Sequence, residues 1–187
     1  LSIQSGSTKV LKEMRRHYDR NHLENVLSKL NNIQRVEWIK VSIGADLIVW
    51  FPGETEDEFL DTFNLVRDYK ISKLHAFPFS AHTFWEKVPA SDFQNQVDEK
   101  TKKDRLDRLI ALWNEVRDEF IKSQMDVVHE VLIETVKKDD FTGQTKNYID
   151  VTKDKFEIIS WTLDKNSKKK KKITKVLSLE NEGLNSE

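Results

Sequence analysis

The stretch LIVWFPGETEDEF at residues 47–59 decides the fold of this chain. It begins as an apolar strand that ends at Trp50, and a tight Phe-Pro-Gly turn follows. Thr55 and Glu58 then form a capping-box pattern, which predicts the start of a helix. A strand that stops at such a turn brings backbone N–H groups and the Glu54 carboxylate to the C-terminal edge of a sheet. Because open and barrel-like α/β folds bind small molecules at that edge, the stretch predicts a binding site.

Strand and helix patterns alternate on both sides of this stretch. Ser7 and Asp19 are expected to cap the first two helices. Alternation with short links indicates parallel βα units. The expected strands are residues 1–3, 39–50 and 72–79, and the expected helices are residues 7–14, 19–30 and 55–69.

The second half of the chain has a different pattern. Residues 79–97 have no clear periodicity and predict a long loop, whereas residues 98–124 form the longest helical pattern, an apolar stripe with charges on the other faces. Short strand patterns separated by polar turns then predict a small antiparallel barrel. These strands are expected at residues 127–136, 147–151, 155–159 and 173–179.

The composition is that of a soluble protein. Of the 187 residues, 34% are charged and 37% are hydrophobic, and the net charge of −1 argues neither for nor against nucleic acid. No apolar run approaches the roughly 18–20 residues that span a bilayer. We therefore expect a monomer in the cytoplasm, with no membrane partner.

Four segments together resemble the radical-SAM methylthiotransferases. They are LSIQSGSTKVLKEM at residues 1–14, RRHY at residues 15–18, the stretch at residues 47–59, and KLHAFPFS at residues 73–80. The resemblance covers roughly residues 1–160. It implies an enzyme that inserts a methylthio group into a tRNA adenosine beside the anticodon or into a ribosomal-protein aspartate. KLHAFPFS is most similar to the branch that acts on threonylcarbamoyladenosine in tRNA.

The resemblance also implies an architecture. The fold class is α/β, with the second half of a partial (β/α)6 radical-SAM barrel followed by a small antiparallel β-barrel. The implied parts are that barrel half at residues 1–97, a connecting helix at residues 98–124, an RNA-binding TRAM-like domain at residues 125–180 and a disordered tail at residues 181–187. The TRAM match rests on VLIE at residues 131–134 and FTGQTKNYIDV at residues 141–151.

The chain contains no cysteine. The resemblance implies S-adenosylmethionine and two [4Fe–4S] clusters, each held by three cysteines, and such clusters need thiolate ligands. We therefore expect a C-terminal fragment whose clusters are ligated outside it. The alternative is a cysteine-free homologue, a non-catalytic RNA-binding protein that kept the scaffold. The sulfur source and the electron donor stay open.

Several polar residues are candidates for contact with the cofactor. Gln4 and Ser5 lie where a strand becomes a helix, and such side chains can hold a carboxylate or ribose hydroxyls. Of the pair Arg15 and Arg16, we select Arg16 for a bidentate contact with a carboxylate; the alternative is an exposed basic pair.

Three further candidates lie on or after the predicted strands. Asp46 lies among apolar residues, where a carboxylate is costly unless it is paired; its alternative role is a structural hydrogen bond. Gly53 and Glu54 form the turn, although Glu54 can equally stabilise the following helix through its dipole. His75 is a weak catalytic candidate, because a lone histidine on a strand is more often a core residue. No metal-ligand spacing is visible.

The TRAM-like part supplies the expected RNA contacts. Between Lys165 and Lys175 there are seven lysines and no acid, and flanking strands predict that this run is the tip of a hairpin. Such lysines would neutralise phosphates and would not read bases; the alternative is a solvated turn. The expected RNA-binding residues are Lys146, Asn147, Tyr148, Lys168, Lys169, Lys170, Lys171 and Lys172.

The tryptophans are anomalous, since the chain has five Trp and only five Gly. Trp50 stands where the family pattern has glycine, and Trp85 stands near a family glycine. Trp38 and Trp161 lie at expected strand ends. We hypothesise that several are glycines read from a recoded UGA codon, whereas Trp113 is an ordinary core residue. The alternative is a divergent enzyme with real tryptophans.

Overall fold

The structure is a computed structural model that describes residues 1–33, 38–79, 95–125, 127–137, 140–152, 157–163 and 171–176. Trp85, Lys168–Lys170, most of the expected loop and the C-terminal tail lie outside these residues. The chain divides into two compact units: residues 1–32 with 43–120, and residues 33–42 with 121–187. Each unit is described by itself.

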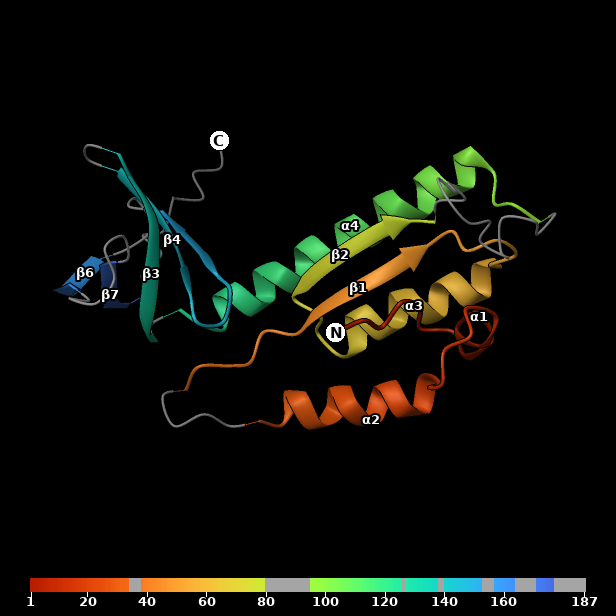
Figure 1. The fold of residues 1–187 in the computed structure, drawn as a ribbon, viewed down its shortest axis with the longest axis horizontal. Coiled ribbons are helices and arrows are strands. Elements are labelled where there is room, and N and C mark those ends of the chain that lie inside the picture. Colours follow the sequence, from red (N-terminus) through yellow and green to blue (C-terminus); the bar gives the residue numbers. More distant parts are fainter. Residues whose placement is uncertain are drawn as a thin grey trace, which may run out of the picture. The chain divides into compact units, whose positions relative to one another are not determined.

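The first unit is a small parallel sheet with helices. Strands β1 (Gly44–Val49) and β2 (Lys73–Pro78) pair in parallel, with Asp46 opposite His75. Gln4 adds a parallel bridge to Leu47 on the other edge of β1. Figure 1 shows the strands side by side, with helices along them. These helices are α1 (Thr8–Glu13), α2 (Arg20–Asn31), α3 (Glu56–Asp68) and α4 (Glu99–Lys122).

The N-terminal caps of the helices can be compared with those predicted from the sequence. The capping box at Thr55 and Glu58 is confirmed, with both of its hydrogen bonds present at the start of α3. The Asp19 cap of α2 is also confirmed, since its side chain accepts the His22 N–H. The prediction for Ser7 is wrong in its chemistry. Ser7 occupies the N-cap position, but its hydroxyl makes no cap bond, and the Ser7 N–H donates instead to Ser5 Oγ at 3.1 Å.

The core of the first unit follows the alternation of β1. Ala45, Leu47 and Val49 are buried, whereas Asp46 and Ile48 on the other face are partly exposed. This burial contributes about 25 cal/mol for each Å² of apolar surface removed from water. The helices supply most of the other core side chains, which include Leu11, Leu27, Phe59, Leu65, Val66, Leu109 and Val116.

The second unit is an antiparallel sheet with the strand order β5-β4-β3-β7-β6. Gly143 permits the close pairing of β3 and β4, because a Cβ there would lie 2.5 Å from the Leu132 carbonyl oxygen. The expectation of a strand at residues 39–50 is wrong at its start, since residues 33–42 belong to this unit and β1 begins only at Gly44. The strands are β3 (Val128–Lys137), β4 (Asp140–Thr145), β5 (Asp150–Thr152), β6 (Glu157–Leu163) and β7 (Lys171–Val176).

The described residues therefore form a mixed α/β protein with two small sheets, and neither sheet closes into a barrel within that part of the chain. Among the same residues, no helix is both long and apolar enough to cross a membrane.

Candidate functional site

The turn at residues 4–7 is built into the scaffold. Ser5 is fully buried, and its hydroxyl lies 3.3 Å from Thr62 Oγ1 on α3. The Gly6 N–H donates to the same Thr62 oxygen at 2.8 Å. A Cβ on Gly6 would lie 2.6 Å from both the Asp61 carbonyl oxygen and Thr62 Cα. The Ser5 hydroxyl is thus occupied by the protein and is a structural group in this geometry.

Gln4 differs from its neighbour Ser5. Its backbone adopts the left-handed region with φ of 69° and bonds to β1 through the Asp46 oxygen and the Ile48 N–H, both at 2.8 Å. The Gln4 side chain makes no hydrogen bond among the described residues, although the residue is only 8% exposed. Of the two candidates in this turn, Gln4 is the one with a polar group left for a ligand.

The turn at residues 50–54 joins β1 to α3 at the C-terminal end of the strand. Trp50 and Gly53 both have positive φ, 71° and 82°. The Glu54 N–H closes the turn on the Phe51 oxygen at 2.9 Å, and the Gly53 N–H donates to the Asn95 oxygen at 2.6 Å. Among the described residues, nothing lies within 4 Å of a Cβ placed on Gly53. The turn is open around Gly53, but the Gly53 N–H is already used.

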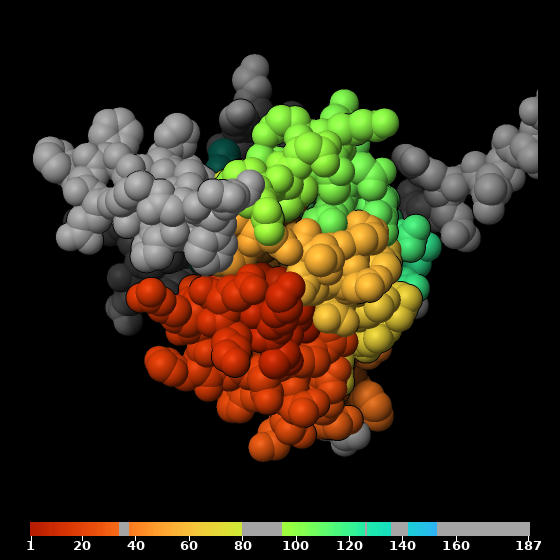
Figure 2. Space-filling view, turned by 90° about the vertical axis from the view of Figure 1, so that its right-hand side faces the viewer, coloured from red at the N-terminus to blue at the C-terminus, as the bar shows by residue number. Residues whose placement is uncertain are grey.

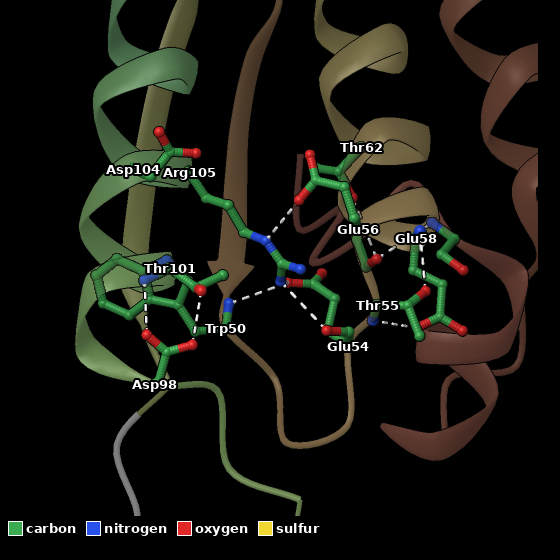
Figure 3. Close-up of polar contacts among 12 residues, drawn as sticks. Trp50, Glu54, Thr55, Glu56, Glu58, Thr62, Asp98, Thr101, Asp104 and Arg105 are labelled. Atoms are coloured by element: carbon green, nitrogen blue, oxygen red, sulfur yellow. Dashed lines mark hydrogen bonds and ion pairs between the residues drawn. The ribbon is translucent and has the colours of Figure 1, made fainter.

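Glu54 is a buried carboxylate with identified partners. Its Oε2 accepts the Trp50 N–H at 3.2 Å and lies 3.4 Å from Arg105 Nη1 on α4. Its side chain is 2% exposed and that of Arg105 is 5% exposed. Burial raises the pKa of the Glu54 carboxyl from its ordinary 4.5 to about 7, and the Trp50 N–H and Arg105 oppose this shift. Figure 3 shows Glu54 between Trp50 and Arg105.

Figure 2 looks onto the same end of the first unit. Residues of α1 (red), residues that follow β1 (light orange) and the start of α4 (green) lie together there. An ion pair of 2.7 Å between Lys9 Nζ on α1 and Glu58 Oε1 on α3 joins two of these elements.

The open face of the small sheet brings together two of the predicted residues. Asp46 and His75 are directly opposite in the strand register, and His75 Nδ1 lies 3.6 Å from Asp46 Oδ1. Their side chains are 41% and 55% exposed. The His75 ring also lies edge-on to that of the exposed Phe77, with 6.5 Å between centroids. Because a carboxylate, an imidazole and an aromatic ring share this face, it can offer both hydrogen bonds and stacking to a ligand.

Arg15 and Arg16 are both exposed at the end of α1. Arg15 has a positive φ of 57°. Arg16 forms no ion pair among the described residues, so its guanidinium is accessible. Within the same part of the chain, no group of three or more His, Asp or Glu side chains could hold a metal ion.

The predicted RNA residues of the second unit divide into two kinds. Lys146 and Tyr148 are exposed, although Lys146 pairs with Glu130 at 2.5 Å. Asn147 is 4% exposed, and its amide bonds to Thr145, to the Lys40 oxygen and to Gln124 Oε1. In this structure Asn147 has a structural role, because its hydrogen bonds hold Lys40 and Gln124 beside the sheet, and its contact with RNA stays a prediction.

The lysine run is described only at its end. Lys171 and Lys172 begin β7, which pairs antiparallel with β6 and places Leu163 opposite Lys171. The predicted hairpin is confirmed, but its second strand starts at Lys171 and not at residue 173. Lys168–Lys170 lie between these strands in the sequence and outside the described residues.

Two structural residues cannot be recognised from the sequence pattern. Arg105 lies outside the apolar stripe of the long helix, among its charged positions, yet it is 4% exposed. Gln124 is fully buried and accepts hydrogen bonds from the Lys40 N–H and from Asn147, both at 2.9 Å. The side-chain partners of Arg105 are 49 to 51 residues away, and the groups that donate to the Gln124 side chain are 23 and 84 residues away, so no local pattern reveals these contacts.

Two tryptophans have the backbone geometry expected of glycine. Trp38 and Trp50 have φ of 61° and 71°, a region that a bulky residue rarely adopts. The Trp50 indole N–H is buried without a partner among the described residues, and Trp38 is 84% exposed. Trp113 is different, because it lies in α4 and its indole N–H donates to the Ser72 oxygen at 3.0 Å.

Comparison with known proteins finds relatives that are named for adding a methylthio group to tRNA. The chain is 38% identical over 156 residues to the threonylcarbamoyladenosine tRNA methylthiotransferase MtaB of Bacillus subtilis, a match that covers 81% of the chain and 33% of that relative. It is 35% identical over 157 residues to the tRNA-2-methylthio-N(6)-dimethylallyladenosine synthase of Clostridium botulinum, with 80% and 33% covered. For the Alkaliphilus oremlandii enzyme of that name, the identity is 37% over 140 residues, with 75% and 28% covered. No family model matches.

The α/β fold and these similarities define a chain related to tRNA-modifying transferases. More specifically, the chain is similar over about 80% of its length to relatives named as tRNA methylthiotransferases, and the resemblance found in the sequence is confirmed. It spans about a third of the length of these curated relatives.

Proposed function

We propose that this chain is part of an enzyme that adds a methylthio group to a modified adenosine in tRNA. The observation that carries the proposal is the identity of 35–38% over about 80% of the chain to relatives named for this activity. Two arrangements in the structure support it: an open sheet face with polar groups, and a separate antiparallel unit with exposed Lys146 and Tyr148.

The first unit is proposed to form one side of the S-adenosylmethionine pocket, as the later part of a partial (β/α)6 barrel. Asp46 would accept hydrogen bonds from hydroxyl or ammonium groups, and Gln4 would donate or accept beside it. Arg16 would pair with a carboxylate. In such enzymes S-adenosylmethionine supplies both a radical-forming adenosyl group and a methyl group. Because the chain has no cysteine, any [4Fe–4S] cluster must take its thiolates from elsewhere.

The second unit is proposed to be TRAM-like and to hold the tRNA. Lys146 and Tyr148 are exposed on the turn between β4 and β5, and the lysine run belongs to the β6–β7 hairpin region. Lysines there would bind phosphates, and the tyrosine ring could stack on a base.

The proposed substrate is threonylcarbamoyladenosine, with action in the cytoplasm. The support is the KLHAFPFS segment, in which His75 shares the open sheet face with Asp46. Since relatives named for two different nucleosides match the chain at 38% and 35% identity, identity alone does not select between them.

Complementation separates these possibilities. The complete coding sequence that contains this chain would be expressed in a Bacillus subtilis strain that lacks MtaB and in a bacterium that lacks its tRNA-2-methylthio-N(6)-dimethylallyladenosine synthase, and tRNA nucleosides would be measured by mass spectrometry. We expect methylthio-threonylcarbamoyladenosine to return. Return of the dimethylallyl product alone would overturn the substrate proposal, and absence of both products with tRNA binding retained would support a non-catalytic RNA-binding protein.

The RNA role of the lysine run has its own test. Replacing the five consecutive lysines at residues 168–172 by serine should weaken tRNA binding at low salt. The slope of log affinity against log salt should become shallower by about 0.7–0.9 for each phosphate that is no longer neutralised. An unchanged slope would show that the run does not touch RNA.

A further inference from the structure

Arg105 is the buried cation that joins α4 to the turn after β1. Its Nη1 donates to the Glu54 carbonyl oxygen at 3.2 Å and lies 3.4 Å from Glu54 Oε2, while its Nε donates to Glu56 Oε2 at 3.1 Å. Its guanidinium also lies 5.4 Å from the centre of the Phe59 ring. All these partners belong to the end of the turn or to the first residues of α3.

The same contacts reach the first residue of the turn. Glu54 Oε2, which faces Arg105, also accepts the Trp50 N–H at 3.2 Å. A single carboxylate oxygen thus links the end of β1, the start of α3 and α4, as Figure 3 shows. A buried carboxylate without a paired cation is strongly disfavoured. Without Arg105, the buried position of the Glu54 side chain would therefore be destabilised.

We propose that Arg105 is a positioning residue, which holds the turn at residues 50–54 in the conformation that binds S-adenosylmethionine. The identity of the ligand rests on the proposed function, whereas the role of Arg105 in holding the turn rests on the observed contacts alone. Arg105 itself would not touch the ligand, because its guanidinium is occupied by Glu54 and Glu56 and is buried.

Lysine cannot replace arginine here. The fork of the guanidinium reaches the carbonyl and carboxylate of Glu54 and the Glu56 carboxylate together, whereas an ammonium is a point charge. Arg105→Lys therefore keeps the positive charge but removes the forked arrangement of donor groups. It is also the milder variant if Arg105→Ala fails to fold.

Arg108 supplies a matched control one helical turn further along α4. It pairs with Glu56 at 2.7 Å and with Asp104 at 3.2 Å, and its guanidinium lies 4.9 Å from the centre of the Phe59 ring. Its side chain is 38% exposed, and none of these contacts involves Glu54. Arg108→Gln removes an Arg–Glu56 pair and leaves the Glu54 contacts in place.

The first measurement is amide hydrogen exchange on this chain. In Arg105→Lys, the Trp50 N–H should exchange about tenfold faster or more, because its acceptor is no longer held. The amides of Leu47 and Ile48 in β1 should keep their rates, and Arg108→Gln should change neither group. Wild-type exchange at Trp50 would overturn the proposal, and so would a uniform increase across β1, which is the signature of a merely structural residue.

The second measurement is the dissociation constant of S-adenosylmethionine for the complete protein with its clusters assembled. Arg105→Lys should weaken binding about tenfold, and Arg108→Gln should leave it unchanged. Unchanged affinity together with a loosened turn would overturn the link to binding. If the wild-type protein does not bind S-adenosylmethionine, the proposed function fails, and the exchange result still decides whether Arg105 holds the turn.

Discussion

The two turns that lead into α1 and α3 in the first unit differ in how tightly they are packed. The strand expected at residues 1–3 is reduced to a single bridge at Gln4. The turn at residues 4–7 lies against α3, and no Cβ fits on Gly6. The turn at residues 50–54 has open space around Gly53, a tryptophan with positive φ and a buried Glu54–Arg105 pair. Ser5 and Gly6 of the first turn are therefore scaffold, and Gln4 is the ligand candidate of that turn. The second turn combines a positive φ at Trp50 with free space at Gly53 among the described residues, and strained backbone of this kind is frequent at binding sites.

The largest expected effect tests the tight turn. Gly6→Ala should lower the free energy of unfolding by about 3 kcal/mol, because the new Cβ would meet the backbone of α3 and not a flexible side chain. Urea denaturation measures this change. Gly44→Ala is the control, since its Cβ would lie 3.7 Å from Lys73 Cβ, an ordinary contact, and should cost less than about 1 kcal/mol. Equal costs for the two variants would remove the contrast between the turns.

The next effect concerns the charge in the open turn. The pKa of Glu54 is raised from 4.5 to about 7 by burial, so folding disfavours its ionised form. The stabilising contribution of neutral Glu54 is full below pH 4.5 and is lost as the pH rises through about 7. Over that window the wild type should lose up to about 3 kcal/mol relative to Glu54→Gln. Denaturation of both proteins at several pH values measures this, and parallel curves would contradict it.

Gly53 tests the backbone of the open turn. Gly53→Ala should cost about 1 kcal/mol, because its φ of 82° is disfavoured for alanine although the space is free. The cost should thus be well below that of Gly6→Ala. A similar loss for both would mean that the turn at residues 50–54 is packed as tightly as the first.

The smallest effect is expected at Trp50. Trp50→Gly loses packing against the core, but it relieves a positive φ and removes a buried indole N–H without a partner among the described residues, so the net change in the free energy of unfolding should stay within about 1 kcal/mol. Trp50→Ala, which loses the same packing and keeps the strain, should be less stable than Trp50→Gly. Trp113→Gly should instead cost about 3 kcal/mol, because it removes a hydrogen bond and packing and lowers helix propensity. Equal losses at both tryptophans would contradict the glycine hypothesis for Trp50, and UGG codons at Trp38, Trp50 and Trp85 would refute recoding there.

The sequence alone determined the features that depend on neighbours along the chain. The turn and capping box at residues 50–58, the Asp19 cap and the long helix are local patterns, and their hydrogen bonds span three or four residues. The strand before the turn was recognised from its apolar run. The family likewise followed from ordered motifs. The sequence predicted parallel strands, but the position of Asp46 opposite His75 came from the structure.

Only the tertiary structure decided which polar residues are available. Ser5 and Thr62 are 57 residues apart, and Asn147 reaches the Lys40 oxygen across 107 residues. In the sequence, Arg105 has the pattern of an exposed charge on a helix. In the structure it is buried against Glu54 and Phe59. A polar side chain forms hydrogen bonds with the groups that tertiary packing places next to it. The local sequence does not encode contacts between residues that are so far apart along the chain.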